Sequence, residues 1–276
     1  MYKKILFFGL IALCFWNAYP KAEDCISDEN IPVTVIMYHN ISPKPQLTGQ
    51  YCVSVEEFER DLKNIVKQGY TTVSVKQLAD YYNGVGKLPQ RPMVITFDDG
   101  QESFYKYAYP LLKKYNCCAV MNVVGSFADE YTENNDHNVD YSYLNWQEIK
   151  ELAESGIVEI GNHTYAMHEI TALRKGCGIK QGQEPLEYCN ELNEDIGKLQ
   201  NRLEAFTGKG AYIFAYPYGY ISKQAPDIIK NMGFQAMLTC EERVNYTSDE
   251  AWIYKLGRFN RSGKISSDSF FEKNNK

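Results

Sequence analysis

Short apolar runs alternate along the chain with longer stretches of helical character. The apolar runs lie near 32–38, 93–97, 119–124, 157–161, 212–216 and 234–239. Runs of this length with few polar interruptions are typical of strands buried on both faces of a parallel sheet. The helical stretches lie near 55–68, 76–83, 103–115, 146–154, 187–206 and 223–232. The alternation predicts an α/β fold built from βαβ units.

Residues able to do chemistry stand just past several of these runs. They are His39, Asp98, His163, Tyr218 and Cys240. If the strands are parallel, their carboxyl ends meet at one rim, and all five residues converge there. The segment 170–190 contains three glycines and Pro185, which predicts a loop at the same rim that shapes access to it.

Two adjacent carboxylates, Asp98 and Asp99, end the apolar run 94–97 and precede Gly100. In parallel α/β folds, catalytic residues lie at the carboxyl ends of strands, which is where these acids fall. An exposed Asp-Asp-Gly turn would give the same sequence. The two interpretations stay open on this segment alone.

Two of the four histidines, His163 and His168, are five residues apart and follow the run 157–161. Five residues on a helix would turn the two rings roughly 140° apart, so a loop must carry them if they act together. Two imidazoles and one carboxylate suit a divalent metal that keeps positions open for water and substrate, with zinc the best fit. The alternative is a histidine at a turn and another in the core.

A rigid turn follows the run 212–216, because Pro217 fixes its own φ and Gly219 permits a sharp change of direction. Such a turn can aim a backbone N–H, which makes the N–H of Tyr218 a candidate oxyanion donor. An ordinary turn with Tyr216 and Tyr218 as packing residues is the alternative.

Composition and net charge indicate how many domains the chain forms and which partners it does not bind. The chain has 276 residues, of which 44% are hydrophobic, and no segment resembles a linker between domains. This predicts one domain with a large core. The formal net charge of −6 argues against nucleic acid as a partner.

The amino terminus has Lys3 and Lys4 before the apolar stretch 5–16, which is the pattern of a secretory signal. We therefore expect residues 1–22 to be a signal peptide, or an uncleaved anchor that tethers the protein to a membrane, and residues 23–276 to be the exported catalytic domain. Removal of residues 1–22 would leave seven of the eight cysteines, an odd number that defines no complete disulfide framework. Cys177 and Cys189 are the candidate pair.

The Thr-Phe-Asp-Asp-Gly run at 96–100, the histidine loop at 163–168 and the Tyr-Pro-Tyr-Gly turn at 216–219 occur in this order. They resemble the polysaccharide deacetylases of carbohydrate esterase family 4, which have a NodB-homology domain. The five-residue histidine spacing and the early segment 35–41 are most similar to the branch of poly-N-acetylglucosamine deacetylases. The resemblance runs from about Pro32 to Arg258 and implies a single-domain, distorted (β/α) barrel with about seven strands.

The resemblance also implies a secreted hydrolase that removes N-acetyl groups from N-acetylglucosamine-containing glycans such as peptidoglycan, poly-N-acetylglucosamine or chitooligosaccharides. Asp99, His163 and His168 match the metal ligands, with zinc favoured over cobalt, nickel or manganese. Asp98 matches the base that takes a proton as water attacks the acetamide carbonyl. The Tyr218 N–H and the metal would hold the oxyanion, and the products would be acetate and a free amine.

Two positions depart from the family pattern. Ala215 stands where many members have an arginine that tethers the catalytic acid, and Cys240 stands where a histidine usually serves as general acid. His39 is the first candidate for the acid, with a hydrogen-bonded core or turn histidine as the alternative. Arg258 is a candidate replacement for the arginine, with a surface salt bridge as the alternative. His137, in a polar stretch, is expected to be solvent-exposed.

Two other functions remain as alternatives. A weakly active or inactive glycan-binding protein would keep the pocket without the acid, but it would not need Asp98. An O-deacetylase acting on acetylxylan would use the same metal and water on an ester. The intact set of Asp98, Asp99, His163 and His168 favours the N-deacetylase.

Overall fold

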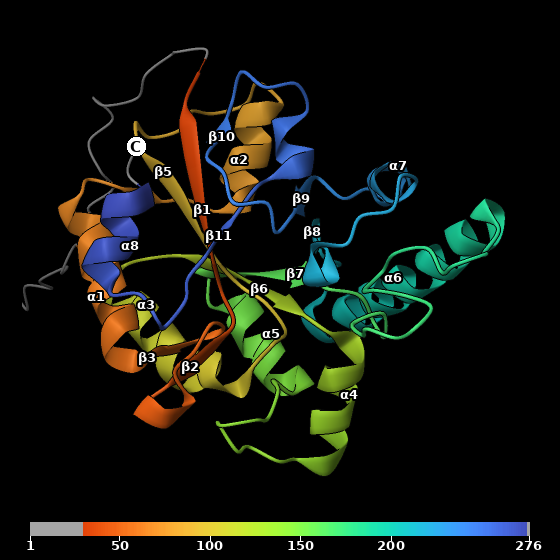
Figure 1. Ribbon diagram of the computed structural model, residues 1–276, viewed down its shortest axis with the longest axis horizontal. Helices are drawn as coiled ribbons and strands as arrows, with labels where there is room; N and C mark the ends of the chain where they lie inside the picture. Colours follow the sequence, from red (N-terminus) through yellow and green to blue (C-terminus); the bar gives the residue numbers. More distant parts are fainter. Residues whose placement is uncertain (1–29, 275–276) are drawn as a thin grey trace, which may run out of the picture.

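A curled sheet of mainly parallel strands forms the centre of the protein (Figure 1). The computed structural model describes residues 30–274. Along the sheet the strand order is β10-β1-β5-β6-β7-β8-β9, with β11 beside β1 and β4 beside β5, and only β10 is antiparallel to its neighbour. The strands are β1 (Pro32–Tyr38), β4 (Thr71–Thr72), β5 (Pro92–Phe97), β6 (Ala119–Val123), β7 (Val158–Asn162), β8 (Ile213–Ala215), β9 (Ala236–Leu238), β10 (Asn245–Tyr246) and β11 (Phe259–Asn260). A separate parallel pair, β2 (Asn40–Ser42) and β3 (Cys52–Ser54), lies past the end of β1.

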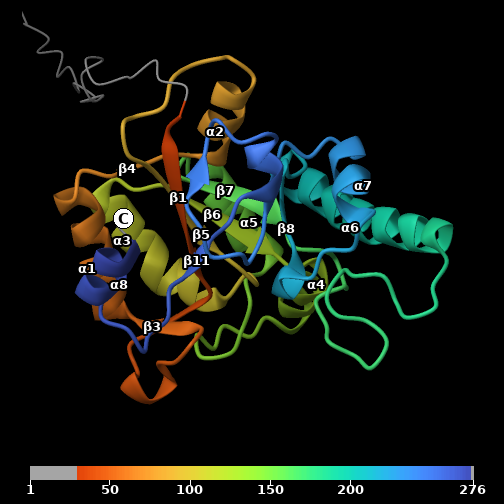
Figure 2. The same ribbon diagram turned by 45° about the horizontal axis from the view of Figure 1, so that its top comes forward.

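Helices surround the sheet, as the two ribbon views show (Figures 1 and 2). They are α1 (Val55–Lys67), α2 (Val75–Tyr82), α3 (Tyr109–Tyr115), α4 (Gly125–Asn134), α5 (Trp146–Glu154), α6 (Pro185–Thr207), α7 (Ala225–Asn231) and α8 (Ser267–Asn274). Among these helices of residues 30–274, none has both the length and the apolar character needed to cross a membrane. The predicted signal or anchor at 1–22 lies outside the described residues.

Both faces of the main strands are buried, in two separate hydrophobic clusters. In β5, Ile95 and Phe97 pack in the larger cluster with the outer helices, whereas Val94 packs in the second cluster with β1, β8 and β9. Successive side chains of a strand point to opposite faces, so this alternation explains why the strands are continuous apolar runs in the sequence. It also determines that Asp98, two residues past Thr96, continues the inner face.

The sheet is closed by the segment 256–260. Leu256 N donates to Met237 O at 3.0 Å, and Thr239 N donates to Leu256 O at 2.8 Å, which joins the segment to β9. Three and four residues after Leu256, Phe259 and Asn260 pair with β1. The segment thus bridges the two sides of the curled sheet, and the predicted distorted barrel with about seven strands is confirmed.

The six predicted strands and six predicted helices are confirmed within a few residues. The sequence pattern missed α4, α8 and the short strands, including β11 in the closing segment. The predicted disulfide is wrong, because Cys177 and Cys189 are both free. Cys177 is fully buried with its Sγ directed at Tyr220 O, whereas the Cys189 Sγ contacts Asn193 on its own helix.

Candidate active site

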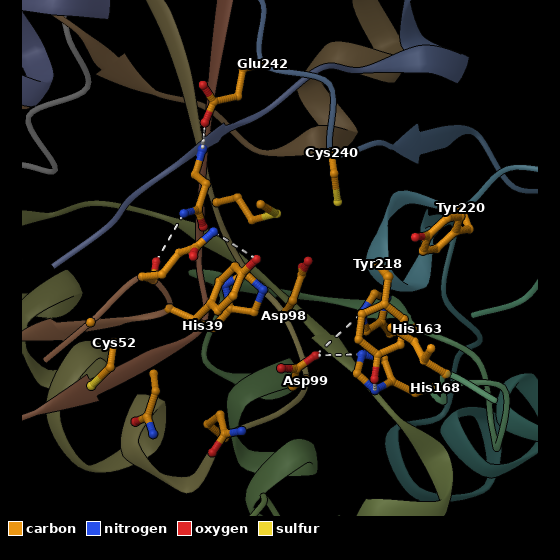
Figure 3. A pocket seen from close by; sticks show the side chains of 18 of the residues that line it. His39, Cys52, Asp98, Asp99, His163, His168, Tyr218, Tyr220, Cys240 and Glu242 are labelled. Carbon is orange, nitrogen blue, oxygen red and sulfur yellow. Dashed lines mark hydrogen bonds and ion pairs between the residues drawn. The ribbon is translucent and has the colours of Figure 1, made fainter. Parts of the chain in front are cut away.

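One cavity of about 890 Å³ opens at the carboxyl ends of the parallel strands. It is lined by all five residues that were predicted to converge there: His39 after β1, Asp98 after β5, His163 after β7, Tyr218 after β8 and Cys240 after β9. Figure 3 shows Asp98 between His39 and the group formed by Asp99, His163 and His168. The convergence follows from the parallel topology, which brings these strand ends to one rim.

Asp98 is an anchored anion. Its side chain is buried, and Arg258 donates to both of its oxygens, Nη1 to Oδ1 and Nη2 to Oδ2, each at 2.8 Å. Asn122 Nδ2 also donates to Oδ1, at 2.7 Å. Burial alone would raise the pKa of Asp98, but the charge and hydrogen bonds of Arg258, together with the nearby His163 and His39, outweigh burial and hold the pKa at about 2. Because Oδ1 accepts two of these bonds and Oδ2 only one, Oδ2 keeps a lone pair for a further partner.

Arg258 is fully buried in the closing segment between β9 and β1. Besides Asp98, its guanidinium donates to Thr239 O at 2.8 Å and to Thr96 Oγ1 at 3.2 Å. The surface salt bridge left open above is therefore wrong, and Arg258 supplies the contact that Ala215 cannot make. A planar guanidinium suits this position because it pairs with both carboxylate oxygens in one geometry.

Asp99, His163 and His168 form a group whose ligand atoms lie within 4.8 Å of one another. Asp99 Oδ1 is 3.1 Å from His168 Nε2 and 3.6 Å from His163 Nε2 (Figure 3). His163 Nδ1 lies 2.8 Å from Ala215 O, so this ring nitrogen carries the proton and Nε2 is free to bind a metal. Burial raises the pKa of Asp99, but its contacts with the two imidazoles lower it far more, so Asp99 is ionised.

Three residues of this rim have a left-handed backbone: Asp99 with φ 74°, Thr164 with φ 70° and Tyr218 with φ 57°. They are half of the six non-glycine residues with positive φ in residues 30–274. Consecutive strand residues face opposite sides, so the sharp turn at Asp99 is what directs two adjacent carboxylates into one cavity. Strained backbone of this kind is stable only where surrounding structure imposes it.

His39 faces the cavity with its Nδ1 buried and without a hydrogen-bond partner in the described part of the chain. Its ring packs against Tyr51 with centroids 4.8 Å apart. Burial lowers the pKa of His39, while Asp98 and Asp99 act in the opposite direction. Buried ring nitrogens of core histidines are normally hydrogen-bonded, so His39 is not an ordinary core histidine, and its position in the cavity lining favours a role toward the substrate. The role of general acid stays a prediction.

Cys240 is a weaker acid than the histidine that the resemblance implies at this position. Burial raises the pKa of its thiol, although the nearby Arg258 charge acts against this shift. Its Sγ lies 4.0 Å from Arg258 Nη2. A thiol with a raised pKa is a poor proton donor at neutral pH.

The side chain of Tyr218 has a contact that the sequence did not reveal. Its hydroxyl lies 3.3 Å from His168 Nδ1, and the two rings are 4.5 Å apart. The phenol therefore orients His168 from the open side of the cavity, where Tyr218 is 44% exposed. Its backbone N–H as oxyanion donor stays a prediction.

Asn122 is the site residue that sequence reasoning missed completely. It is the one amide in the strand β6 and is fully buried. Gly161 on the neighbouring strand leaves the space that the Asn122 side chain fills, since a Cβ at Gly161 would lie 2.0 Å from Asn122 Oδ1. A lone amide within an apolar strand is the signal that could have identified it.

The barrel and its site define a class of protein, and comparison with known proteins agrees with it. The family model for polysaccharide deacetylases matches residues 85–237, and the chain belongs to that family. Among curated relatives, the chain is 27% identical over 224 residues to the poly-beta-1,6-N-acetyl-D-glucosamine N-deacetylase of Escherichia coli (strain K12), over 75% of this chain and 33% of that protein. It is 29% identical over 221 residues to the protein of the same name from Staphylococcus aureus (strain MRSA252), over 80% of this chain and 70% of that protein. The chain thus spans about a third of the length of the E. coli relative.

Solved structures have the same fold. IcaB from Ammonifex degensii superposes with a TM-score of 0.71 at 27% identity, covering 87% of this chain and 94% of that chain. The de-N-acetylase from Aggregatibacter actinomycetemcomitans superposes with a TM-score of 0.75 at 24% identity, covering 87% and 99% respectively. The similarity to the Aggregatibacter structure is evidence for a shared fold and for nothing further.

Proposed function

We propose that this protein is a metal-dependent deacetylase that hydrolyses N-acetyl groups of N-acetylglucosamine-containing glycans. The observation that carries the proposal is a single cavity in which an anchored carboxylate, Asp98, lies beside a carboxylate and two imidazoles arranged as metal ligands. The E. coli and S. aureus relatives, named as poly-N-acetylglucosamine deacetylases, favour that polymer as the substrate. Peptidoglycan and chitooligosaccharides present the same acetamide.

The donor set fits a divalent metal such as zinc. Asp99 is ionised and His163 presents a free Nε2, which are the protonation states that ligands require. His168 Nε2 is close enough to Asp99 to share an ion with it. Three protein ligands leave positions open for water and substrate, where the metal would acidify bound water and polarise the amide carbonyl.

Asp98 is the base in this mechanism. Its Oδ2 accepts a single hydrogen bond and keeps a lone pair, and because Asp98 lines the cavity this oxygen can accept the proton of the attacking water. Arg258 and Asn122 hold the carboxylate so that it cannot turn away, which keeps the reacting atoms aligned. A pKa of about 2 keeps Asp98 ionised at neutral pH.

His39 and Tyr218 have the two remaining roles in this mechanism, those of general acid and oxyanion donor. His39, whose ring lines the cavity, donates a proton to the leaving amine. The Tyr218 N–H stabilises the oxyanion as the carbonyl carbon becomes tetrahedral. Products are acetate and a glycan with a free amine.

The buried tether of Asp98 argues against the alternative of an inactive glycan-binding protein. A binding site has no use for a carboxylate that is buried, ionised and oriented by a fully buried arginine. We further propose that the protein acts outside the cytoplasm, exported by its amino-terminal segment, because polymeric cell-surface glycans are the substrates. An uncleaved segment would tether it to the membrane.

Acetate release tests the proposal. Purified protein is incubated with β-1,6-linked N-acetylglucosamine oligomers, chitooligosaccharides, peptidoglycan and acetylxylan, after chelation and after zinc is restored. We expect zinc-dependent release from one or more N-acetylated glycans, and Asp98→Asn should abolish turnover while zinc stays bound. Glu242→Gln, a carboxylate at the rim of the same cavity, is the matched control and should retain turnover.

Two results would contradict the proposal. Protein that binds zinc stoichiometrically but releases acetate from no N-acetylated glycan would favour the binding-protein alternative. Turnover unchanged by Asp98→Asn would overturn the assignment of the base.

A further inference from the structure

A second group of ligand-type side chains lies outside the cavity. Glu102 comes from the segment after β5, His137 from the loop between α4 and α5, and Glu148 from the first turn of α5. His137 Nδ1 is 3.3 Å from Glu102 Oε1 and 3.4 Å from Glu148 Oε1. None of the three has a role in the proposed deacetylation.

The two carboxylates of this group are buried beside each other. Glu102 is 5% exposed and Glu148 is 9% exposed, and His137 is the single cationic-type side chain that pairs with either of them in the described chain. Burial and the neighbouring charge of Glu148 raise the pKa of Glu102 to about 7. Glu102 Oε2 is buried with no donor facing it in residues 30–274. Such a pair needs a cation or a shared proton to be stable.

The distances between the ligand atoms of Glu102, His137 and Glu148 fit a bound metal ion. Ligand bonds of zinc to nitrogen and oxygen are about 2.0–2.2 Å long, and a tetrahedral arrangement then places ligand atoms about 3.3–3.5 Å apart. The separations of 3.3 Å and 3.4 Å at His137 match this value. They resemble the 3.1 Å and 3.6 Å separations around Asp99.

The two glutamates are also held in place by their own backbone surroundings. Glu148 Oε2 accepts from Asn145 N at 3.0 Å in the capping box of α5, which leaves Oε1 for another partner. Glu102 N donates to Ser142 O at 2.9 Å, which ties it to the same loop that carries His137. His137 is 44% exposed, so an ion can reach the group from solvent. Ligands positioned in this way bind metals without reorganisation.

We propose that Glu102, His137 and Glu148 bind a second divalent transition-metal ion, with zinc as the fitting type. The ion would pin the loop between α4 and α5 to the segment that begins at Asp99. The same loop carries Tyr143, whose ring packs at a tilt against Phe127 with centroids 4.3 Å apart. Phe127 in turn meets the His168 ring edge to face, with centroids 5.9 Å apart. The second site therefore supports one wall of the cavity from outside.

The number of bound ions tests the proposal. The full chain is dialysed against buffered Zn²⁺, and bound zinc is counted by mass spectrometry for the wild type and for His137→Ala. We expect two ions per chain in the wild type and one in His137→Ala. Asp136→Asn, which removes a neighbouring charge but keeps its contact with Asn138 N, is the matched control and should retain two ions.

A second measurement separates the two sites. In an Asp99→Asn background, Zn²⁺ should still raise the melting temperature, and adding Glu102→Gln or His137→Ala should remove that rise. Ca²⁺ and Mg²⁺, which prefer all-oxygen sites, should produce a smaller rise. Equal zinc content in the wild type and His137→Ala would overturn the proposal, as would a single ion per chain lost entirely with Asp99→Asn.

Discussion

At the scale of single residues, the ion pair between Asp98 and Arg258 decides what the cavity can do. Both side chains are buried, and their two bonds of 2.8 Å leave one oxygen position open toward the cavity. Removal of one partner of a buried pair leaves an uncompensated charge, which costs about 3–5 kcal/mol. The pair thus contributes both stability and orientation.

Replacing Arg258 separates these contributions. Arg258→Lys keeps the charge but loses the paired geometry, so we expect kcat to fall roughly 10- to 100-fold in protein that still folds. Steady-state acetate release measures this. Arg261→Lys is the control, because Arg261 is equally buried but pairs with Asp61 away from the cavity. It should lower stability and leave kcat of the folded protein unchanged; an equal loss of kcat in both variants would show a general packing effect.

Gly161 has no side chain, and this leaves the space that the side chain of Asn122 occupies. In Gly161→Ala the new Cβ would collide with Asn122 Oδ1, so Asn122 must move away from Asp98. A hydrogen bond to a charged group is worth about 1.5–3 kcal/mol, and we expect kcat to fall at least about tenfold. Gly197→Ala on α6 is the matched control, because nothing lies within 4 Å of its Cβ. It should stabilise the protein by up to about 1 kcal/mol. Unchanged kcat in Gly161→Ala would mean that Asn122 does not position Asp98.

At the scale of elements, the closing segment 256–260 positions Arg258 beside Asp98. Asn245 in β10 holds this segment: its Nδ2 donates to Gly257 O at 3.0 Å and to Val33 O at 3.2 Å, and its Oδ1 accepts from Gly257 N at 2.7 Å. Asn245 is fully buried, so each of these backbone groups depends on it.

Removing this amide should loosen the closure. In Asn245→Ala, three buried backbone groups lose their partner, and we expect the free energy of unfolding to fall by about 2–4 kcal/mol. We also expect kcat to fall, because Arg258 follows Gly257 directly. Urea unfolding and acetate release measure the two effects. Ser248→Ala, which breaks an exposed bond to Asn30, should change neither. A loss of stability at full kcat would show that Arg258 keeps its place without this support.

At the scale of the whole molecule, acidic side chains lie close together at the two proposed metal sites. When no metal is bound, the free energy of unfolding should therefore depend on pH. The pKa of Glu102 lies at about 7 in the folded protein, above its ordinary value of 4.5. The folded state then binds this proton more tightly than the unfolded state. The stabilisation is complete below about pH 4.5 and is lost as the pH rises through about 7.

A comparison of wild type with Glu102→Gln measures this contribution. Glutamine has no proton to release, so in the presence of chelator the fall in unfolding free energy between pH 5 and pH 8 should be smaller in the variant. Chemical denaturation at the two pH values gives the difference. Glu151→Gln, an exposed change on α5, the helix that carries Glu148, should behave as the wild type. An identical fall in Glu102→Gln would mean that Glu102 does not titrate in this range.

The main strands and the groups that follow them were predictable from the sequence because their signals are local. Buried parallel strands are apolar runs, and the residues just past each run, such as Asp98 and His163, must lie at one rim once the strands are parallel. Short strands such as β11 have too few residues to show an apolar run or an alternation of polar and apolar residues. The closing segment could therefore not be recognised from the sequence as part of the sheet.

The sequence pattern was enough to predict an α/β fold, a shared rim and the carboxylates and imidazoles at that rim, and the resemblance of its motifs implied the barrel. The tertiary structure alone decided which side chains touch. Arg258 reaches Asp98 across 160 positions, and Asn122 reaches it from a neighbouring strand. Likewise, His137 meets Glu102 and Glu148 only after α4 and α5 have packed. Periodicity depends on neighbours along the chain, whereas these contacts depend on sheet register and closure, which long-range packing sets.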